Sequence, residues 1–512
     1  MSKYDPIIYG KSDIEKIVSI EIHDGIARLF IENPDEIIIQ DIPSKPWVLS
    51  HRQLDKSMIE LKGSQYFKYG KQFPTLAEFN KFKHNNYLRD IYTIHNLKEN
   101  CMINKGLTYF KGMKIEDVSV LSFDIETNGL KMDSTSKVFL ISNTYKKNNK
   151  IIKKLFSVDE YESEAEMVNE WCKWVCDVNP SILLGHNILS YDLPFLHHII
   201  TREGHEGLTL GRDGSLLSFN EKESRFRVDG NRDLHYNKSV VYGRELIDTM
   251  FLAYRYDIGR KYESYGLKPI IKQEGLEDSN RTFYDASKIK DNWHNKEERE
   301  KIKAYAIDDA DDSLKLFYLM APSVFYMTQS VPKPFQLMTE SATGSQLNAI
   351  MVRAYLQQGH SIAKADDVEQ FEGGISFGVP GIYRNVEKWD IVSAYPSVII
   401  GKQLCDTKKD PYKYFPYIVS FFKSERIKNK GLSKETGEKY YEDLQSSQKV
   451  FINSSFGLCG TGGLNYNCPR IAAEITRTTR QTIERALLWA SGEDRDFWQK
   501  KFNEGVYGED EE

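Results

Sequence analysis

The stretch Leu121–Thr127, LSFDIET, places two carboxylates inside an apolar segment. In a β-strand, side chains alternate between the two faces, so Asp124 and Glu126 project from the same face. Two carboxylates on a buried strand repel each other and lose solvation unless a positive group offsets them. A divalent cation would do so, whereas a structural or solvated pair is the alternative for these two residues taken alone.

Two further stretches favour the metal interpretation. NPSILLGHNILSYDLPFL, residues 179–196, carries Asp192 after another apolar segment. KIKAYAIDDADDSLKLFYLM, residues 301–320, carries Tyr305 and Asp309 four residues apart, and therefore on one face of a helix. Oxygen-only ligands select hard cations, Mg²⁺ or Mn²⁺, over zinc. The sequence thus predicts one site formed by four carboxylates and a tyrosine.

Some neighbours of these residues invite chemical roles that we do not assign to them. Asp311 and Asp312 lie on the same predicted helix as Asp309, and we expect them on a solvated face. His186 stands beside Asn187 and could be read as a general base, but we favour a structural role for it.

Composition sets the outer limits. The chain has 512 residues, of which 40% are hydrophobic and 12% aromatic, and this length predicts about three domains. The net charge of -5 argues against a simple basic nucleic-acid coat but permits a basic groove beside acidic metal sites. No apolar run of about 18 residues and no secretory leader is found, so we expect no membrane association. Six sparse cysteines without a CxxC pair favour a reducing, intracellular compartment.

The order of apolar and charged segments predicts the domains. Residues 1–105 mix short apolar alternations with a charged helical stretch, typical of a mixed α+β domain. From about residue 115, strand-type and helical segments alternate, which favours an α/β domain over 106–335. A Gly- and Asn-rich stretch predicts an inserted hairpin at about 205–240, and the Pro-bearing QSVPKPFQ marks a boundary near residue 335.

The three acidic stretches resemble, in order and spacing, the motifs of DnaQ-like 3′→5′ exonucleases, in the subclass whose third motif is YxxxD. The resemblance implies an RNase H-like fold with two metals about 3.5–4 Å apart that stabilise the attacking and leaving oxygens of phosphodiester hydrolysis. It implies that Asp124, Glu126 and Asp309 hold the first metal, with Asp124 also on the second. Asp192 would support the second metal through water, and Tyr305 would orient the attacking water.

A second set of motifs begins after the boundary. Residues 371–400, FEGGISFGVPGIYRNVEKWDIVSAYPSVII, contain a Gly pair that lets backbone approach closely, then a predicted strand that leads to Asp390. This string resembles the linker motif and palm motif A of family B DNA polymerases. The resemblance implies that Asp390 binds the catalytic metals and that Ser393 and Ala394 lie against the incoming triphosphate. Tyr395 would exclude a ribose 2′-hydroxyl.

LQSSQKVFINSSFGLCG, residues 444–460, places Lys449, Asn453 and Phe456 at i, i+4 and i+7, on one predicted helix face. It resembles motif B, KxxxNSxYG, with phenylalanine where tyrosine is usual. Upstream, Arg426 and Lys430 match the triphosphate-binding pair of the fingers helix, although an RxxxK spacing alone is more often a solvated helix face.

GVYGEDEE, residues 505–512, stands where family B polymerases carry motif C, typically YGDTD. We interpret it as an altered motif C in which Glu509 and Glu511 take the places of metal-binding aspartates, and not as a solvated acidic tail. The sequence stops where the hairpin should turn back, so we expect the returning strand and the thumb to be supplied by another polypeptide.

The predicted fold is therefore a multidomain α/β protein. It consists of a mixed α+β N-terminal domain, an RNase H-like exonuclease domain, and an incomplete family B palm and fingers. Within the palm and fingers, we expect the palm to start at 336–405, the fingers to follow at 406–460 and the palm to continue at 461–512.

The function expected from the resemblance is template-directed DNA synthesis with proofreading by a split or truncated replicative polymerase of the bacteriophage type. Expected ligands and partners are two Mg²⁺ or Mn²⁺ ions per site, primer-template and single-stranded DNA, deoxynucleoside triphosphates, a C-terminal palm and thumb polypeptide, and a sliding clamp. The location would be the cytoplasm, that of a host cell for a viral protein. A stand-alone exonuclease and a non-catalytic DNA-binding subunit are the alternatives.

Overall fold

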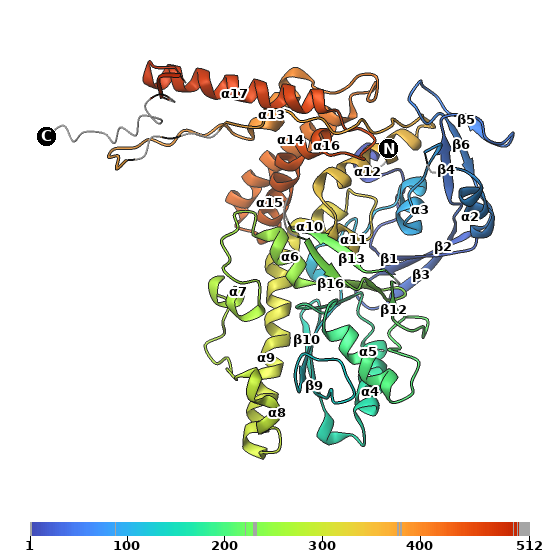
Figure 1. Ribbon diagram of the computed structural model, residues 1–512, viewed down its shortest axis with the longest axis vertical. Coiled ribbons are helices and arrows are strands. Elements are labelled where there is room, and N and C mark those ends of the chain that lie inside the picture. Colours follow the sequence, from blue (N-terminus) through green and yellow to red (C-terminus); the bar gives the residue numbers. More distant parts are fainter. Residues whose placement is uncertain are drawn as a thin grey trace.

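The computed structural model describes residues 3–87, 89–220, 222–228, 233–375, 378, 381–494, 496–498 and 500. Figure 1 shows strands gathered toward the N-terminal (blue) and middle (green) parts of the sequence, and long helices in the yellow to red part. Glu509 and Glu511 lie outside the described residues, so the altered motif C stays a prediction.

Two small antiparallel sheets form the N-terminal part. The first has the order β1-β2-β3, with β1 (Ile17–His23), β2 (Ile26–Glu32) and β3 (Ile37–Pro43). The second has the order β5-β6-β4-β7, with β4 (Trp47–Ser50), β5 (Ile59–Glu60), β6 (Tyr69–Gln72) and β7 (Ile91–Tyr92). Helices α1 (Pro6–Tyr9), α2 (Leu76–Asn85) and α3 (Leu97–Lys105) accompany them. Isolated bridges join Lys62 to His360 and Phe67 to Ile362, so a later segment of the chain returns to this part.

A five-stranded sheet forms the centre of the next part, with the order β10-β9-β8-β11-β16. Its strands are β8 (Val120–Thr127), β9 (Val138–Lys147), β10 (Lys150–Ser157), β11 (Ile182–Gly185) and β16 (Glu245–Asp248). The first three pair antiparallel, whereas β11 runs parallel to both β8 and β16. Parallel strands end at the same edge of a sheet, so the residues that close or follow β8, β11 and β16 meet there.

Helices cover this sheet, and a hairpin region is inserted before its last strand. The helices are α4 (Glu164–Val178), α5 (Asp192–Arg202), α6 (Thr249–Tyr256), α7 (Leu267–Gln273), α8 (Ile289–Asn292) and α9 (Lys296–Met320). In the inserted region, β12 (Ser218–Phe219) pairs with β15 (Ser239–Val240), and β13 (Ser224–Arg227) pairs with β14 (Asp233–Tyr236). The side chain of Asn295 caps α9 by accepting the N–H groups of Glu297 and Glu298, which fixes where this long helix begins.

The remaining described part is helical. It contains α10 (Pro322–Thr328), α11 (Phe335–Glu340), α12 (Thr343–Leu356), α13 (Ala394–Lys402), α14 (Tyr414–Thr436), α15 (Lys439–Ser454), α16 (Phe456–Gly460) and α17 (Pro469–Ser491). One apolar core joins this part to the N-terminal sheets, because residues such as Val18, Phe110, Phe325, Val352 and Phe451 belong to a single buried cluster. Among the described helices, none is long and apolar enough to cross a membrane.

The predicted strand before Asp390 is wrong for the described residues 381–393, where no strand is found. A β-strand needs a neighbouring strand to satisfy its backbone groups, and none of the described strands pairs with this segment. Its apolar side chains are correspondingly exposed: Ile382 is 98% and Val386 71% accessible.

A buried ion pair ties the N-terminal part to the helical part, and breaking it should be costly. Lys333 and Glu99 lie 2.7 Å apart with side chains only 7% exposed each. We expect Lys333→Met to lower the free energy of unfolding in urea by about 3–5 kcal/mol, because it leaves a buried carboxylate unpaired. Lys439→Met, which breaks the exposed pair with Asp443, should cost less than about 1 kcal/mol. Equal effects of the two variants would contradict the assignment, and adding Glu99→Leu to Lys333→Met should restore most of the loss.

Candidate active site

Three predicted carboxylates converge at the edge of the sheet. Asp124 and Glu126 project from β8, and Asp309 reaches them from α9, so that one oxygen of each lies within 4.8 Å of the others. Asp192 begins α5, and its carboxylate is close enough to that of Asp124 to raise the pKa of Asp124 by repulsion. The structure therefore brings together all four carboxylates that the sequence singled out.

The cluster carries strong electrostatic strain. Burial raises the pKa of Asp124 well above its usual range, and repulsion from Asp192, Glu126 and Asp309 raises it further. Burial, followed by the charge of Asp309, raises the pKa of Glu126 to about 8, and burial with Asp248 raises the pKa of Asp192 to about 8. Within the described chain, the carboxylates of Asp124 and Glu126 form no hydrogen bond or ion pair. Clustered buried oxygens without a donor are the arrangement that a hard divalent cation satisfies.

Lys268 on α7 is a site residue that sequence analysis missed. Its ammonium lies 4.2 Å from the ring centroid of Tyr305 and donates a hydrogen bond to the tyrosine hydroxyl. The same nitrogen is 3.7 Å from the carboxylate of Asp309. Burial and the surrounding carboxylates raise the pKa of Tyr305, so its hydroxyl stays protonated. The only signal in the sequence was a lysine in a short helical segment, which occurs too often to be informative.

Arg281 was also missed, and it changes the interpretation of the acidic helix. Its guanidinium donates to Asp309 at 2.6 Å and to Asp312 at 2.7 Å, and its side chain is 2% exposed. Asp312 is therefore buried and paired, and the expected solvated face is wrong for it. Asp311 is also paired: it accepts from Thr144 and forms an ion pair with Lys153. The aspartates of α9 thus have two roles. Asp309 belongs to the site, whereas Asp311 and Asp312 form ion pairs that hold the helix in place.

Asp248, at the end of β16, supports the loop that precedes Asp192. Its carboxylate accepts the N–H groups of Asn187, Leu189 and Met250. His186 uses both ring nitrogens, one with Tyr265 O at 2.8 Å and one with Thr249 Oγ1 at 3.0 Å. Burial lowers the pKa of His186 to about 4, so this histidine is a neutral structural group.

Some of the residues predicted to bind a nucleotide meet in the helical part. The guanidinium of Arg426 on α14 donates to Ser393 Oγ at 2.8 Å, and the ring of Tyr395 lies 5.0 Å from that of Phe456. Lys430, Lys449 and Asn453 are exposed. The predicted single helix face holds only in part, because α15 ends at Ser454 and Phe456 opens α16.

Asp390 stands apart from the other predicted ligands. It is exposed and lines a surface cavity of about 750 Å³ together with Ala394 and Trp389. The ring of Trp389 lies 5.1 Å from that of Trp489 on α17. Among the described residues, no other carboxylate joins Asp390 in a cluster that could hold a metal.

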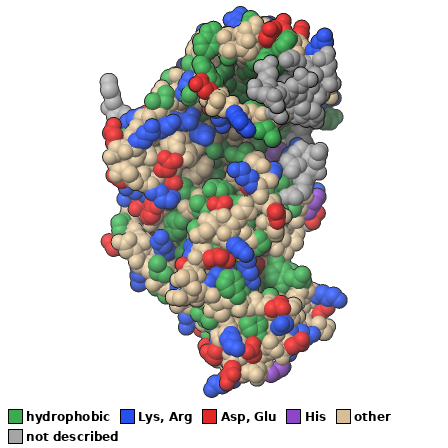
Figure 2. All heavy atoms as spheres, turned by 90° about the vertical axis from the view of Figure 1, so that its left-hand side faces the viewer, with side chains coloured by type: hydrophobic (Ala, Val, Ile, Leu, Met, Phe, Trp, Pro, Cys, Tyr) green, Lys and Arg blue, Asp and Glu red, His purple; other side chains and the backbone are tan. Residues whose placement is uncertain are grey.

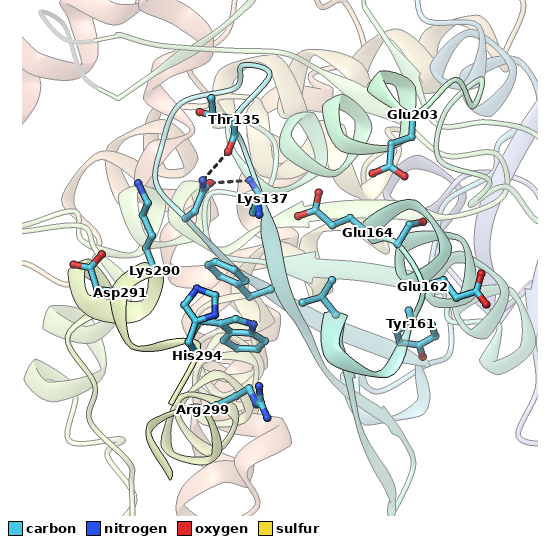
Figure 3. Close-up of a pocket in the computed structure, with 15 residues that line it drawn as sticks. Thr135, Lys137, Tyr161, Glu162, Glu164, Glu203, Lys290, Asp291, His294 and Arg299 are labelled. Carbon is cyan, nitrogen blue, oxygen red and sulfur yellow. Dashed lines mark hydrogen bonds between the residues drawn. The ribbon is translucent and has the colours of Figure 1, made fainter. Parts of the chain in front are cut away.

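A different cavity, of about 910 Å³, opens beyond the end of β8 (Figure 3). Glu162, Glu164 and Glu203 line one side of it, and Lys290, His294 and Arg299 come from the other. None of the predicted site residues lines this cavity. Its floor contains Phe139 and Trp293, stacked at 4.7 Å, which pack in the same small core as Tyr305. The cavity therefore lies beside the residues that pack around Tyr305 and not beside the carboxylates themselves.

A central mixed sheet with carboxylates at one edge is the arrangement that the exonuclease motifs predicted. Comparison with known families agrees: the model for "DNA polymerase family B, exonuclease domain" matches residues 78–270. Over this segment the chain is similar to the exonuclease domain of the family B DNA polymerases.

Individual relatives extend the comparison beyond this domain. A DNA polymerase of Thermococcus sp. (strain 9oN-7) is 25% identical over 427 residues, which cover 75% of this chain and 52% of the relative. The DNA polymerase delta catalytic subunit of Schizosaccharomyces pombe is 25% identical over 465 residues, 77% of this chain and 42% of the relative. This chain therefore spans about half the length of the relatives that it matches.

A solved structure shares the fold. The family B DNA polymerase from the hyperthermophilic archaeon Pyrobaculum calidifontis superposes with a TM-score of 0.75 at 15% identity. The match covers 93% of this chain and 71% of that one, so the likeness of fold includes the N-terminal and helical parts.

Removing divalent cations should destabilise the chain more strongly as the pH rises. The folded-state pKa values of Glu126 and Asp192 are raised to about 8, whereas unfolded carboxyls titrate near about 4. Their contribution to stability is therefore fully present below about pH 4 and is lost as the pH rises through about 8. A bound cation offsets this loss, so the difference in Tm between Mn²⁺ and EDTA should be small at about pH 5 and largest above about pH 8. The Asp124→Asn, Glu126→Gln double variant should lose this trend, and a difference that is independent of pH would contradict it.

Proposed function

We propose that this chain hydrolyses DNA from the 3′ end at the Asp124–Glu126–Asp309 cluster. The observation that carries the proposal is the convergence of these three carboxylates, of which those of Asp124 and Glu126 accept no hydrogen bond within the described chain, in a domain that matches the family B exonuclease model. Magnesium or manganese, when bound by these oxygens, stabilises the charge on the attacking and leaving oxygens of a phosphodiester. Asp124, Glu126 and Asp309 would hold the first ion and Asp192 would support a second.

The remaining groups of the site have roles that follow from their contacts. Tyr305 keeps its proton and can donate a hydrogen bond to the attacking water, and Lys268 fixes its hydroxyl. The positive charge of Lys268 also faces the place where a phosphate would lie beside Asp309. Arg281 holds Asp309 from behind through a bond of 2.6 Å, which orients the remaining carboxylate oxygen.

Figure 2 shows Lys and Arg side chains gathered in a band across the upper part of one face, as a backbone-binding surface requires. Single-stranded and primer-template DNA are therefore the proposed ligands. Proofreading of a growing strand is the proposed use of the hydrolysis.

Hydrolysis is tested with a 5′-labelled DNA strand, Mg²⁺ and the full chain. We expect Asp124→Ala to slow shortening from the 3′ end by at least about 100-fold, and Lys268→Ala by about 10–100-fold, because a ligand costs more than its supporting group. Glu300→Gln changes an exposed charge on the same helix as Asp309 and serves as the matched control. Hydrolysis that continues unchanged in Asp124→Ala would refute the proposal. Hydrolysis that is also indifferent to Asp124→Ala combined with Glu126→Ala would not come from this site, and it would revive a non-catalytic DNA-binding role.

We propose further that the helical part binds a nucleoside triphosphate for DNA synthesis. The contact of Arg426 with Ser393 and that of Tyr395 with Phe456 support this, since they join three motifs that are distant in sequence. Among the described residues no second carboxylate joins Asp390, so synthesis would need further ones, for which Glu509 and Glu511 stay the predicted residues. It would also need a cover for the exposed apolar segment around Ile382, for which a palm and thumb polypeptide is the proposed source. A sliding clamp, the bacteriophage type and a cytoplasmic location stay predictions.

Primer extension separates the two proposed activities. We expect no extension by this chain alone, and extension once a polypeptide that supplies the remaining palm and thumb is added. Asp390→Ala should abolish extension and Arg426→Ala should lower it by about 10–100-fold, by analogy with other charged groups that hold a ligand. Neither substitution should slow hydrolysis of single-stranded DNA. Extension by this chain alone that is lost in Asp390→Ala would show that no added polypeptide is needed.

A further inference from the structure

Two arginines, Arg212 and Arg244, lie together at the end of α4, away from the carboxylate cluster. Both donate to the side-chain oxygen of Asn179, each at 2.9 Å. Their other hydrogen bonds go to Ser181 Oγ and to the backbone oxygens of Pro180 and Leu210. Every one of these acceptors is neutral, and neither guanidinium forms an ion pair with a described carboxylate.

The pair is therefore an excess of buried positive charge. Burial, followed by the charge of Arg244, lowers the pKa of Arg212 to about 9. Burial lowers the pKa of Arg244 to about 10. Glu32 is the one carboxylate that favours the charged form of Arg212, but it already faces Lys147 at 3.6 Å and accepts from Ser119 and Ser181. Keeping a buried arginine charged without a neighbouring anion costs free energy, and a bound anion would offset that cost.

Both arginines line a cavity of about 250 Å³. Its opposite wall is apolar: Phe30 of β2 and its cross-strand neighbour Ile39 of β3 line it, with Ile37 beside them. Arg212 lies 5.2 Å above the ring of Phe30, and its Nη1 is buried without a hydrogen-bond partner. Gly211 and Gly214 leave the third side free of bulky side chains. The cavity thus has one cationic side and one apolar side.

We propose that this cavity binds the phosphate group of a nucleoside monophosphate, with the phosphate on Arg212 and Arg244. Guanidinium groups match the geometry of phosphate oxygens, and two of them neutralise a phosphate dianion. The sugar and base then lie against Phe30 and Ile39, which explains why an isoleucine that is 57% exposed stands beside a charged site. This site is independent of hydrolysis at the carboxylate cluster.

The experiment is equilibrium dialysis of radiolabelled dAMP against the full Asp124→Ala chain in EDTA, where the metal-dependent site neither binds nor hydrolyses. We expect saturable binding with one site per chain that inorganic phosphate displaces at higher concentration and deoxyadenosine does not. Arg212→Gln should weaken dAMP binding by at least about 10-fold, the loss of one charge-assisted bond.

Two controls keep the test decisive. Arg255→Gln alters a half-buried arginine that bonds to backbone oxygens outside the cavity, and should leave binding within about 2-fold. Ile39→Glu places a negative charge at the exposed rim without disturbing the core, so it should weaken binding at least about 10-fold even if Arg212→Gln does not fold.

Competition experiments distinguish a free nucleotide from the phosphorylated end of a DNA strand, and two other outcomes would overturn the proposal. Competition by a 5′-phosphorylated oligonucleotide equal to that by dAMP, with none by its unphosphorylated form, would assign the site to a strand terminus that carries the same phosphate chemistry. Absence of saturable dAMP binding up to about 5 mM, or binding that neither Arg212→Gln nor Ile39→Glu weakens, would overturn the proposal.

Discussion

Mutual repulsion among buried carboxylates is the constraint on which the rest of this structure depends. Asp124, Glu126, Asp192 and Asp309 come from β8, α5 and α9, and they meet only because β11 runs parallel to β8 and so brings α5 to the same edge. Burial raises the pKa values of all four, and repulsion from the neighbouring carboxylates raises those of Asp124 and Glu126 as well. The folded chain thus holds mutually repelling carboxylates at one edge of the sheet, and a bound cation would reduce that repulsion. The site therefore favours the binding of positive charge.

The surrounding structure limits that repulsion without removing it. Lys268 of α7 and Arg281 of the loop after α7 both pair with Asp309, and Arg281 also pairs with Asp312. These cations stabilise the carboxylate that comes from the helix, while the two that come from β8 have no such partner within the described chain. The asymmetry is physically reasonable, because the strand is fixed by its sheet on both sides, whereas α9 needs ion pairs to hold its register against β8.

Periodicity accounts for what the sequence could predict. Asp124 and Glu126 are two apart in an apolar strand, and Tyr305 and Asp309 are four apart in a helix, so both pairs could be placed on a face before the structure was known. Lys268 and Arg281 lie in a short helix and a loop, where no period applies, and they reach the site only through the packing of α7 against α9. The same limit explains the error at Asp390: an apolar run can be recognised as a strand, but whether it pairs depends on a partner elsewhere.

The two halves of the molecule are not independent units placed side by side. The core cluster that contains Val18 and Phe110 also contains Phe325, Val352 and Phe451, and α10 packs against α15 directly after α9 ends. Phe325 stacks on Phe110 at 4.4 Å, so the first turn of the helical part rests on the segment that leads into β8. A shift of α15, which carries Lys449 and Asn453, must therefore be transmitted to α10 and the end of α9, because close-packed interiors transmit strain. The helix that carries Asp309 is thus connected, through close packing, to the helices that carry the proposed nucleotide-binding residues.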